Sequence, residues 1–170
     1  MPGKAELIAL LARSAQVVEV ELRLLAHWRP ECEPGRQAQI DVTARYIGVG
    51  LSCARRRTAY ALNEANSLPD VAHAPSSQHM SAVVATVNSV AGRLQWPGPD
   101  LTDEWFDNAM RLAQHNSDQA ADNSEAIYAD CVHGGDNDPP ANLAAAAPPH
   151  LVAALPADKD DGKKPSPGKT

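Results

Sequence analysis

Three consecutive arginines, Arg55, Arg56 and Arg57, make the densest positive charge in this sequence, within CARRRTAYALNEAN at residues 53–66. Guanidinium groups bind phosphates and pair with carboxylates, so the triplet is a candidate contact for a partner of either kind. Because successive residues of a helix point about 100° apart, the three side chains cannot share one surface. We expect Arg57 to flank the buried seam of a helix, with Arg55 and Arg56 on its outer face beside Arg45.

Charge elsewhere in the chain bears on what these arginines bind. Residues 102–132 hold one arginine, Arg111, and the carboxylates of Asp103, Glu104, Asp107, Asp118, Asp122, Glu125 and Asp130. An acidic helix in the same small domain competes with nucleic acid for the arginines, and phosphate recognition normally uses more basic groups than one triplet. The sequence favours a solvated or intrachain-paired arginine face, with a protein-partner patch and a nucleic-acid contact as alternatives.

One imidazole and three carboxylates share a helix face, because His115, Asp118, Asp122 and Glu125 follow steps of 3, 4 and 3. Such groups ligate metals, but a di-metal site in a helical bundle also needs Glu-x-x-His pairs from partner helices, and the sequence has none. Apolar positions such as Phe106 mark the opposite side of the same segment. We expect this acidic stripe to face solvent, and we predict no metal site.

Cysteine and histidine lie close together twice, as His27 with Cys32 and as Cys131 with His133, which together would make a zinc ligand set. In an antiparallel bundle the two pairs lie at opposite poles, separated by a helix of roughly 39 Å. The sequence also lacks G-x-S-x-G, the P-loop, G-x-G-x-x-G and H-E-x-x-H. We therefore predict a protein that is not an enzyme and holds no cofactor.

The apolar residues recur with the period of a helix in four segments, at 4–29, 37–66, 77–96 and 102–132. In the first, they follow steps of 3 and 4 at Ile8, Leu11, Ala15, Val18, Leu22 and Leu25, with a second stripe at Leu10, Val17 and Leu24. Prolines and glycines separate the segments. We predict an all-α protein, an antiparallel four-helix bundle over residues 1–132; the alternative is a set of helical hairpins that complete their core by dimerising.

Two features of these helices stay open at this stage. Gly48 and Gly50 weaken the second segment by roughly 1 kcal/mol each. Ala44, Gly48 and Ser52 are small residues four apart, which could let a neighbouring helix approach closely; the alternative is a local kink. The middle of the last segment, QHNSDQAADNSEA, is polar, so the sequence leaves open whether that helix is continuous.

Residues 133–170 are predicted to be a disordered tail, since they hold seven prolines, an alanine-proline patch and a Lys/Asp end. Within the tail, NLAAAAPPHLVAAL at 142–155 is an apolar stretch that could dock on a groove. The whole chain carries a net charge of −6, which argues against a general binder of nucleic acid or of anionic membranes. Three cysteines without a disulfide pattern favour a reducing compartment.

No signal peptide or membrane-spanning segment is predicted from the sequence. The start, MPGKAELIALLARS, has a glutamate inside a short apolar run, and residues 71–92 are broken by a proline and several polar residues. We expect a cytoplasmic protein, with export by a leaderless route as the other possibility.

The stretch LQWPGPDLTDEWFDNAM at 94–110 places Trp96 and Gly98 between two amphipathic segments. This tryptophan-x-glycine turn resembles that of the WxG helical-hairpin proteins handled by type VII secretion, and the resemblance covers about residues 77–132. It implies an exposed hairpin turn at Trp96 and Gly98 and leaderless export. The chain departs from the family at Pro97 and lacks the aromatic-x-x-x-acid signal after the second helix, where Val132 follows Tyr128. The alternative is that Trp96 covers the rim of a bundle.

Taken together, these patterns favour a non-enzymatic helical protein that acts through protein–protein contacts, as an assembly or adaptor subunit that binds a protein partner or itself. A WxG-like exported protein is the first alternative, and a weak nucleic-acid binder that uses the arginine face is the second. The candidate partner-binding residues are Arg45, Arg55, Arg56, Arg57, Trp96 and Gly98.

Overall fold

The computed structural model describes residues 2–50, 52–71 and 73–133. In that part of the chain it shows five α-helices, one 3₁₀ turn and no strand, so the prediction of an all-α protein is confirmed. The helices are α1 (Pro2–Trp28), α2 (Pro34–Gly48), α3 (Ala54–Ser67), α4 (Ser77–Ala91) and α5 (Asp103–His133), with the 3₁₀ turn at Arg29–Glu31 after α1. The predicted tail, apart from His133 at the end of α5, lies outside the described residues.

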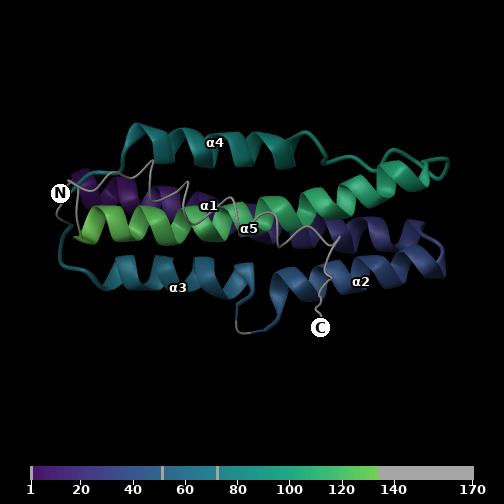
Figure 1. The fold of residues 1–170 in the computed structure, drawn as a ribbon, viewed down its shortest axis with the longest axis horizontal. Coiled ribbons are helices and arrows are strands. Elements are labelled where there is room, and N and C mark those ends of the chain that lie inside the picture. Colours follow the sequence, from purple (N-terminus) through teal and green to yellow (C-terminus); the bar gives the residue numbers. More distant parts are fainter. Residues whose placement is uncertain (1, 51, 72, 134–170) are drawn as a thin grey trace, which may run out of the picture.

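The two long helices, α1 and α5, lie side by side along the molecule and run in opposite directions (Figure 1). On one side they are covered by α4, which runs in the same direction as α1. On the other side α2 and α3 follow each other end to end, so that together they cover the length of the long pair. None of the helices in the described residues is long and apolar enough to cross a lipid bilayer.

The predicted helix over 37–66 is wrong in one respect, because it is divided into α2 and α3. The backbone is extended at Val49, turns through a left-handed conformation at Gly50 (φ 107°), and is extended again at Cys53. Only glycine adopts such a φ without steric cost. The kink is therefore the explanation for the paired glycines, since a Cβ at Gly48 would meet the side chain of Leu22 at an ordinary 3.6 Å.

The core side of α1 is wide, as its two apolar stripes predicted. Leu10, Leu11, Val17, Val18, Leu24 and Leu25 are buried, and Ile8, Ala15 and Leu22 are partly buried. Between the stripes runs a third row with a spacing of seven residues, formed by Leu7, Ser14, Glu21 and Trp28. All four are almost wholly inaccessible, which places a carboxylate in the middle of the core.

The last helix is continuous from Asp103 to His133, although its middle is polar. Helices α1, α3 and α4 all pack on α5, so this stretch is enclosed rather than exposed. Its buried polar side chains are Asn116, Ser117, Asp118, Asn123 and Ser124. Several are hydrogen-bonded internally, as where the Ser124 hydroxyl donates to the carbonyl of Ala120 at 2.8 Å. Polar residues that find partners inside the protein do not need to break the helix.

Helix α4 is shorter than predicted and ends at Ala91 instead of residue 96, because Gly92 closes it. Its start matches the sequence, since the Ser76 hydroxyl accepts a hydrogen bond from the backbone N–H of His79 at 3.2 Å. Likewise Thr102 caps α5 by accepting from the N–H of Trp105 at 3.1 Å. These caps fix where each helix begins.

Candidate functional site

Helix α4 carries no charged residue at all, although it lies on the outside of the bundle (Figure 1). Its inner face is formed by His79, Val83, Thr86 and Val90, which are buried against the rest of the protein. An exposed helix face normally carries charged residues that keep it in water. The centres of protein interfaces, in contrast, are depleted of charge. The composition of α4 therefore marks its outer face as a candidate contact surface.

The outer face of α4 carries an apolar stripe formed by Met80, Val84, Val87, Ala91 and Leu94, the last lying just beyond the helix end. The steps are 4, 3, 4 and 3, the spacing with which one helix packs on another. Met80, Val84 and Leu94 are 38%, 42% and 52% exposed. Single exposed apolar residues are common on protein surfaces, but an aligned row is the pattern of a helix-binding seam. We call these five residues the α4 stripe.

A shallow groove of about 160 Å³ runs between the α4 stripe and α1. Its lining residues are Arg13, Gln16, Val17 and Val20 from α1, and Val87, Val90, Ala91 and Leu94 from α4 and the residues after it. Arg13 is the charged member of this lining. On the same side of α1, at helical spacing, Arg23 and His27 are also exposed. The uncharged seam thus has a basic border formed by Arg13, Arg23 and His27.

A buried polar network fixes the far end of α4 on the core. Arg93, just after the helix, pairs with the carboxylate of Glu21, and its other nitrogen lies 3.4 Å from the carbonyl of Ala109. The amide of Asn116 donates to Glu21 at 3.1 Å and to the Ser89 hydroxyl at 3.2 Å. Burial raises the pKa of Glu21, while Arg93 and Asn116 oppose that rise. The network holds α4 in one register against α1 and α5.

The near end of α4 holds a second buried titratable group. The imidazole of His79 is almost wholly inaccessible, and its Nδ1 lies 3.8 Å from Oδ2 of Asp130 on α5. Burial lowers the pKa of His79, and the carboxylate of Asp130 counteracts only part of that effect. The uncharged imidazole is therefore the form that the folded protein accommodates.

All three arginines of the triplet form hydrogen bonds or ion pairs with other residues of this chain. Arg57 forms two hydrogen bonds with Glu125, each at 2.8 Å, and also pairs with Asp122. Arg55 binds Glu19 of α1 at 2.8 Å, and Arg56 donates to the carbonyl of Gly50 at 3.1 Å. The carboxylates on α5 raise the pKa of Arg57. Arg45 lies apart from the triplet on α2 and is exposed.

These contacts correct the expectation that the acidic stripe on α5 faces solvent. Asp118 is buried and accepts a hydrogen bond from the Tyr46 hydroxyl at 2.9 Å, and Asp122 is largely buried under Arg57. The periodicity of α5 alone did not show that α2 and α3 would cover this side. Among the described residues, no group of three or more His, Cys, Asp or Glu side chains is arranged to hold a metal ion.

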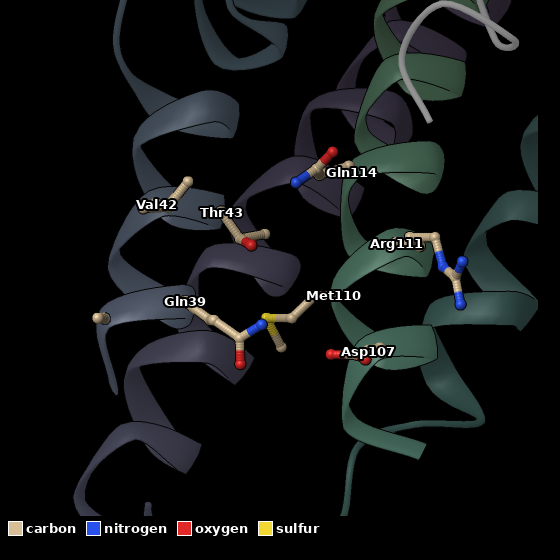
Figure 2. Close-up of a pocket in the computed structure, with 8 residues that line it drawn as sticks. Gln39, Val42, Thr43, Asp107, Met110, Arg111 and Gln114 are labelled. Carbon is tan, nitrogen blue, oxygen red and sulfur yellow. The ribbon is translucent and has the colours of Figure 1, made fainter. Parts of the chain in front are cut away.

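A larger groove, about 480 Å³, lies between α2 and α5 (Figure 2). The α2 side is formed by Ala38, Gln39, Val42 and Thr43, and the α5 side by Asp107, Met110, Arg111 and Gln114. Figure 2 shows the side chains of Gln39 and Met110 extending into it from α2 and α5. Val42 and Tyr46 on α2, and Val49 just after it, add exposed apolar surface. Its lining contains an acidic and a basic residue, Asp107 and Arg111, whereas the groove beside the α4 stripe is lined by one charged residue, Arg13.

The two residues of the tryptophan-x-glycine turn have different environments. Gly98 has a left-handed φ of 114°, and a Cβ there would meet no other atom within 4 Å. Trp96 is half-buried, with its ring centre 5.5 Å from that of Trp28 and 6.1 Å from that of Trp105. Trp96 thus packs into an aromatic cluster that closes one end of the bundle.

The burial of Glu21 on α1 and its pairing with Arg93, just after α4, were not predicted from the sequence. Glu21 lies three residues after Val18 and four before Leu25, so its position within the seam was visible in the spacing. The identity of its partner was not, because Arg93 lies 72 residues away in the chain. Comparison with models of protein families, with curated proteins and with solved structures finds no match to this chain.

Proposed function

We propose that this protein is a non-enzymatic adaptor or assembly subunit that binds an amphipathic helix of a partner protein along the α4 stripe. The observation that carries the proposal is an exposed helix without charge that presents five aligned apolar residues. A partner helix with the same spacing would bury them, and removal of apolar surface from water drives association. The buried network at Arg93 keeps the stripe in a fixed position, which reduces the cost of ordering it on binding.

The residues that border the stripe indicate which charges a partner helix would carry. Arg13, Arg23 and His27 lie on one side of it and no acidic residue lies on α4. We therefore propose a partner helix that has an apolar seam and acidic residues along one flank. Charge complementarity of this kind steers association and sets the orientation of the partner. The same basic border opposes an antiparallel pairing of two α4 faces, which would bring the Arg13 side chains of both copies together.

The test uses two matched substitutions in the full chain, Val84→Asp on α4 and Val42→Asp on α2. Both positions are exposed valines inside helices, at 42% and 62% exposure, so neither change should unfold the protein. Affinity purification from the native source, followed by measurement of each purified partner, compares the two variants with the unaltered chain. Val84→Asp should cost roughly 2 kcal/mol or about thirtyfold in affinity, because it buries a carboxylate in the seam. Val42→Asp should bind normally.

Different results would contradict the proposal. Loss of the partner with Val42→Asp and not with Val84→Asp would move the docking site to the groove between α2 and α5. A partner segment without an apolar seam would contradict the proposed partner helix. Binding that is unchanged in Arg13→Glu and Arg23→Glu at low salt would contradict its proposed acidic flank. Recovery of nucleic acid in place of protein would favour a nucleic-acid contact through the exposed arginines.

A further inference from the structure

We propose that residues 142–161 of this same chain fold back along the α4 stripe and compete with the partner for it. The proposal rests on the proposed function, because it describes how access to that docking face is regulated. Its starting point is where α5 ends. Asp130, close to that end, lies 3.8 Å from His79 at the beginning of α4. The end of α5 therefore lies next to the beginning of α4, where the stripe starts (Figure 1).

The length of chain beyond His133 suits this path. The stripe from Met80 to Leu94 is roughly 20 Å long at the rise of a helix. Residues 134–142 can cover up to about 30 Å when extended, which is enough to reach the stripe from the end of α5. Residues 143–155 are then more than long enough to follow the stripe in the same direction as α4.

The sequence of the tail fits the surface in chemistry and in order. Residues 143–155 contain no Asp, Glu, Lys or Arg, and their largest apolar side chains are Leu143, Leu151, Val152 and Leu155. Three aspartates follow, at 158, 160 and 161, with Lys159 among them, so residues 158–161 carry a net charge of −2. Val20 and Leu94 both line the groove, and Arg23 and His27 lie about one and two turns further along α1 than Val20. A tail that covers the stripe first would bring its aspartates to this basic border next.

An occupant within the same chain has an advantage over a separate partner. Its effective concentration at the stripe is in the millimolar range, since the connecting segment is short. A partner helix would therefore bind only when its contacts exceed those of the tail, and the tail would cover the apolar stripe when the partner is absent. The aspartates give the contact a dependence on salt, because their pairing with Arg23 is screened.

The experiment places a photoreactive benzophenone amino acid at position 84 of the full chain, with position 42 on α2 as the matched control. An equal mixture of isotopically light and heavy protein distinguishes cross-links within one chain from those between copies. The expected result is intrachain cross-links from position 84 to residues 142–161, few from position 42, and their loss in the variant with Leu151→Asp and Leu155→Asp. The charge-reversing substitution Arg23→Glu should reduce these cross-links at low salt.

Two outcomes would overturn the inference. Cross-links from position 84 that join light to heavy chains would assign the stripe to a second copy. Absence of cross-links to 142–161, with the benzophenone shown to react with added partner, would leave the tail off the stripe. Either result leaves the partner test with Val84→Asp intact, so failure of the tail inference and failure of the docking proposal are distinguishable.

Discussion

The pairing of Glu21 with Arg93 offers the sharpest test of how the core holds α4. Glu21 is 0% exposed, and the Arg93 side chain is 12% exposed. Replacing Arg93→Met keeps most of the side-chain volume but leaves a buried carboxylate without its counter-charge. Breaking a buried pair in this way costs roughly 3–5 kcal/mol. The hydrogen bond from Asn116 remains, so we expect a loss of about 3 kcal/mol, or roughly 10 °C in Tm.

The complementary variants separate charge from packing. Glu21→Met leaves Arg93 without its carboxylate, but that side chain lies at the edge of the core and can turn toward solvent, so the loss should be about 1–2 kcal/mol. The double variant, with methionine at both positions, should recover most of the stability, since replacing a buried pair by apolar residues is often neutral or stabilising. Urea unfolding at neutral pH, followed by far-UV circular dichroism, measures all three.

The loss of stability caused by Arg93→Met should also depend on pH. Burial raises the pKa of Glu21 above its ordinary 4.5, so the folded protein keeps this proton to a higher pH than the unfolded chain. The penalty is therefore full at neutral pH and shrinks as pH falls through the folded-state pKa. A loss below about 1 kcal/mol for Arg93→Met, or a double variant as unstable as Arg93→Met alone, would refute this account of the pair.

Three further predictions follow from buried groups. Burial lowers the pKa of His79 below its ordinary value of 6.5, so the free energy of unfolding should be highest above pH 6.5 and should fall as the pH drops below that value. The slope should be at most about 1.4 kcal/mol per pH unit. His79→Leu should remove this slope in urea unfolding. Burial raises the pKa of Cys131 to about 12, so mass spectrometry should find Cys131 unalkylated in the native protein while the half-buried Cys32 reacts slowly. Trp96→Ala should cost roughly 1–3 kcal/mol and reduce the near-UV circular dichroism of the aromatic cluster.

Each of these has an outcome that would contradict it. A stability profile that keeps its acid slope in His79→Leu would assign the slope to other groups. Alkylation of Cys131 at the rate of Cys32 would show that the end of α5 opens readily. Trp96→Ala with unchanged stability would mean that the indole lies on the bundle rim without supporting it.

The sequence predicted the helices well and their surroundings poorly, for physical reasons. Apolar spacing along one helix, as at Leu11, Val18 and Leu25, reports which side is buried, because burial follows the period of the helix. It does not report which other helix covers the remaining sides. The acidic stripe of α5 was expected in solvent for this reason, yet α2 and α3 cover Asp118 and Asp122.

The kink between α2 and α3 was foreseen only as an alternative. Glycines at 48 and 50 are compatible with either a close approach of two helices or a bend. Which one applies depends on the neighbouring helix, and a Cβ at Gly48 would lie at an ordinary contact distance from Leu22. The α4 stripe was not predicted as a docking face, although the sequence already shows that residues 71–92 contain no Asp, Glu, Lys or Arg. The signal on α4 is an absence of charge, which acquires meaning only when the helix is known to lie outside.

The aromatic cluster has a consequence for how this protein can be observed. The chain has three tryptophans, at positions 28, 96 and 105, and all three meet at the same end of the molecule. Intrinsic tryptophan fluorescence therefore reports whether that end is assembled and carries no direct signal from the opposite end, where Leu7, Ile127 and Cys131 pack together. Local opening at the silent end, from which the tail departs, would pass unnoticed in a fluorescence titration. Hydrogen exchange, which resolves opening residue by residue, would reveal it.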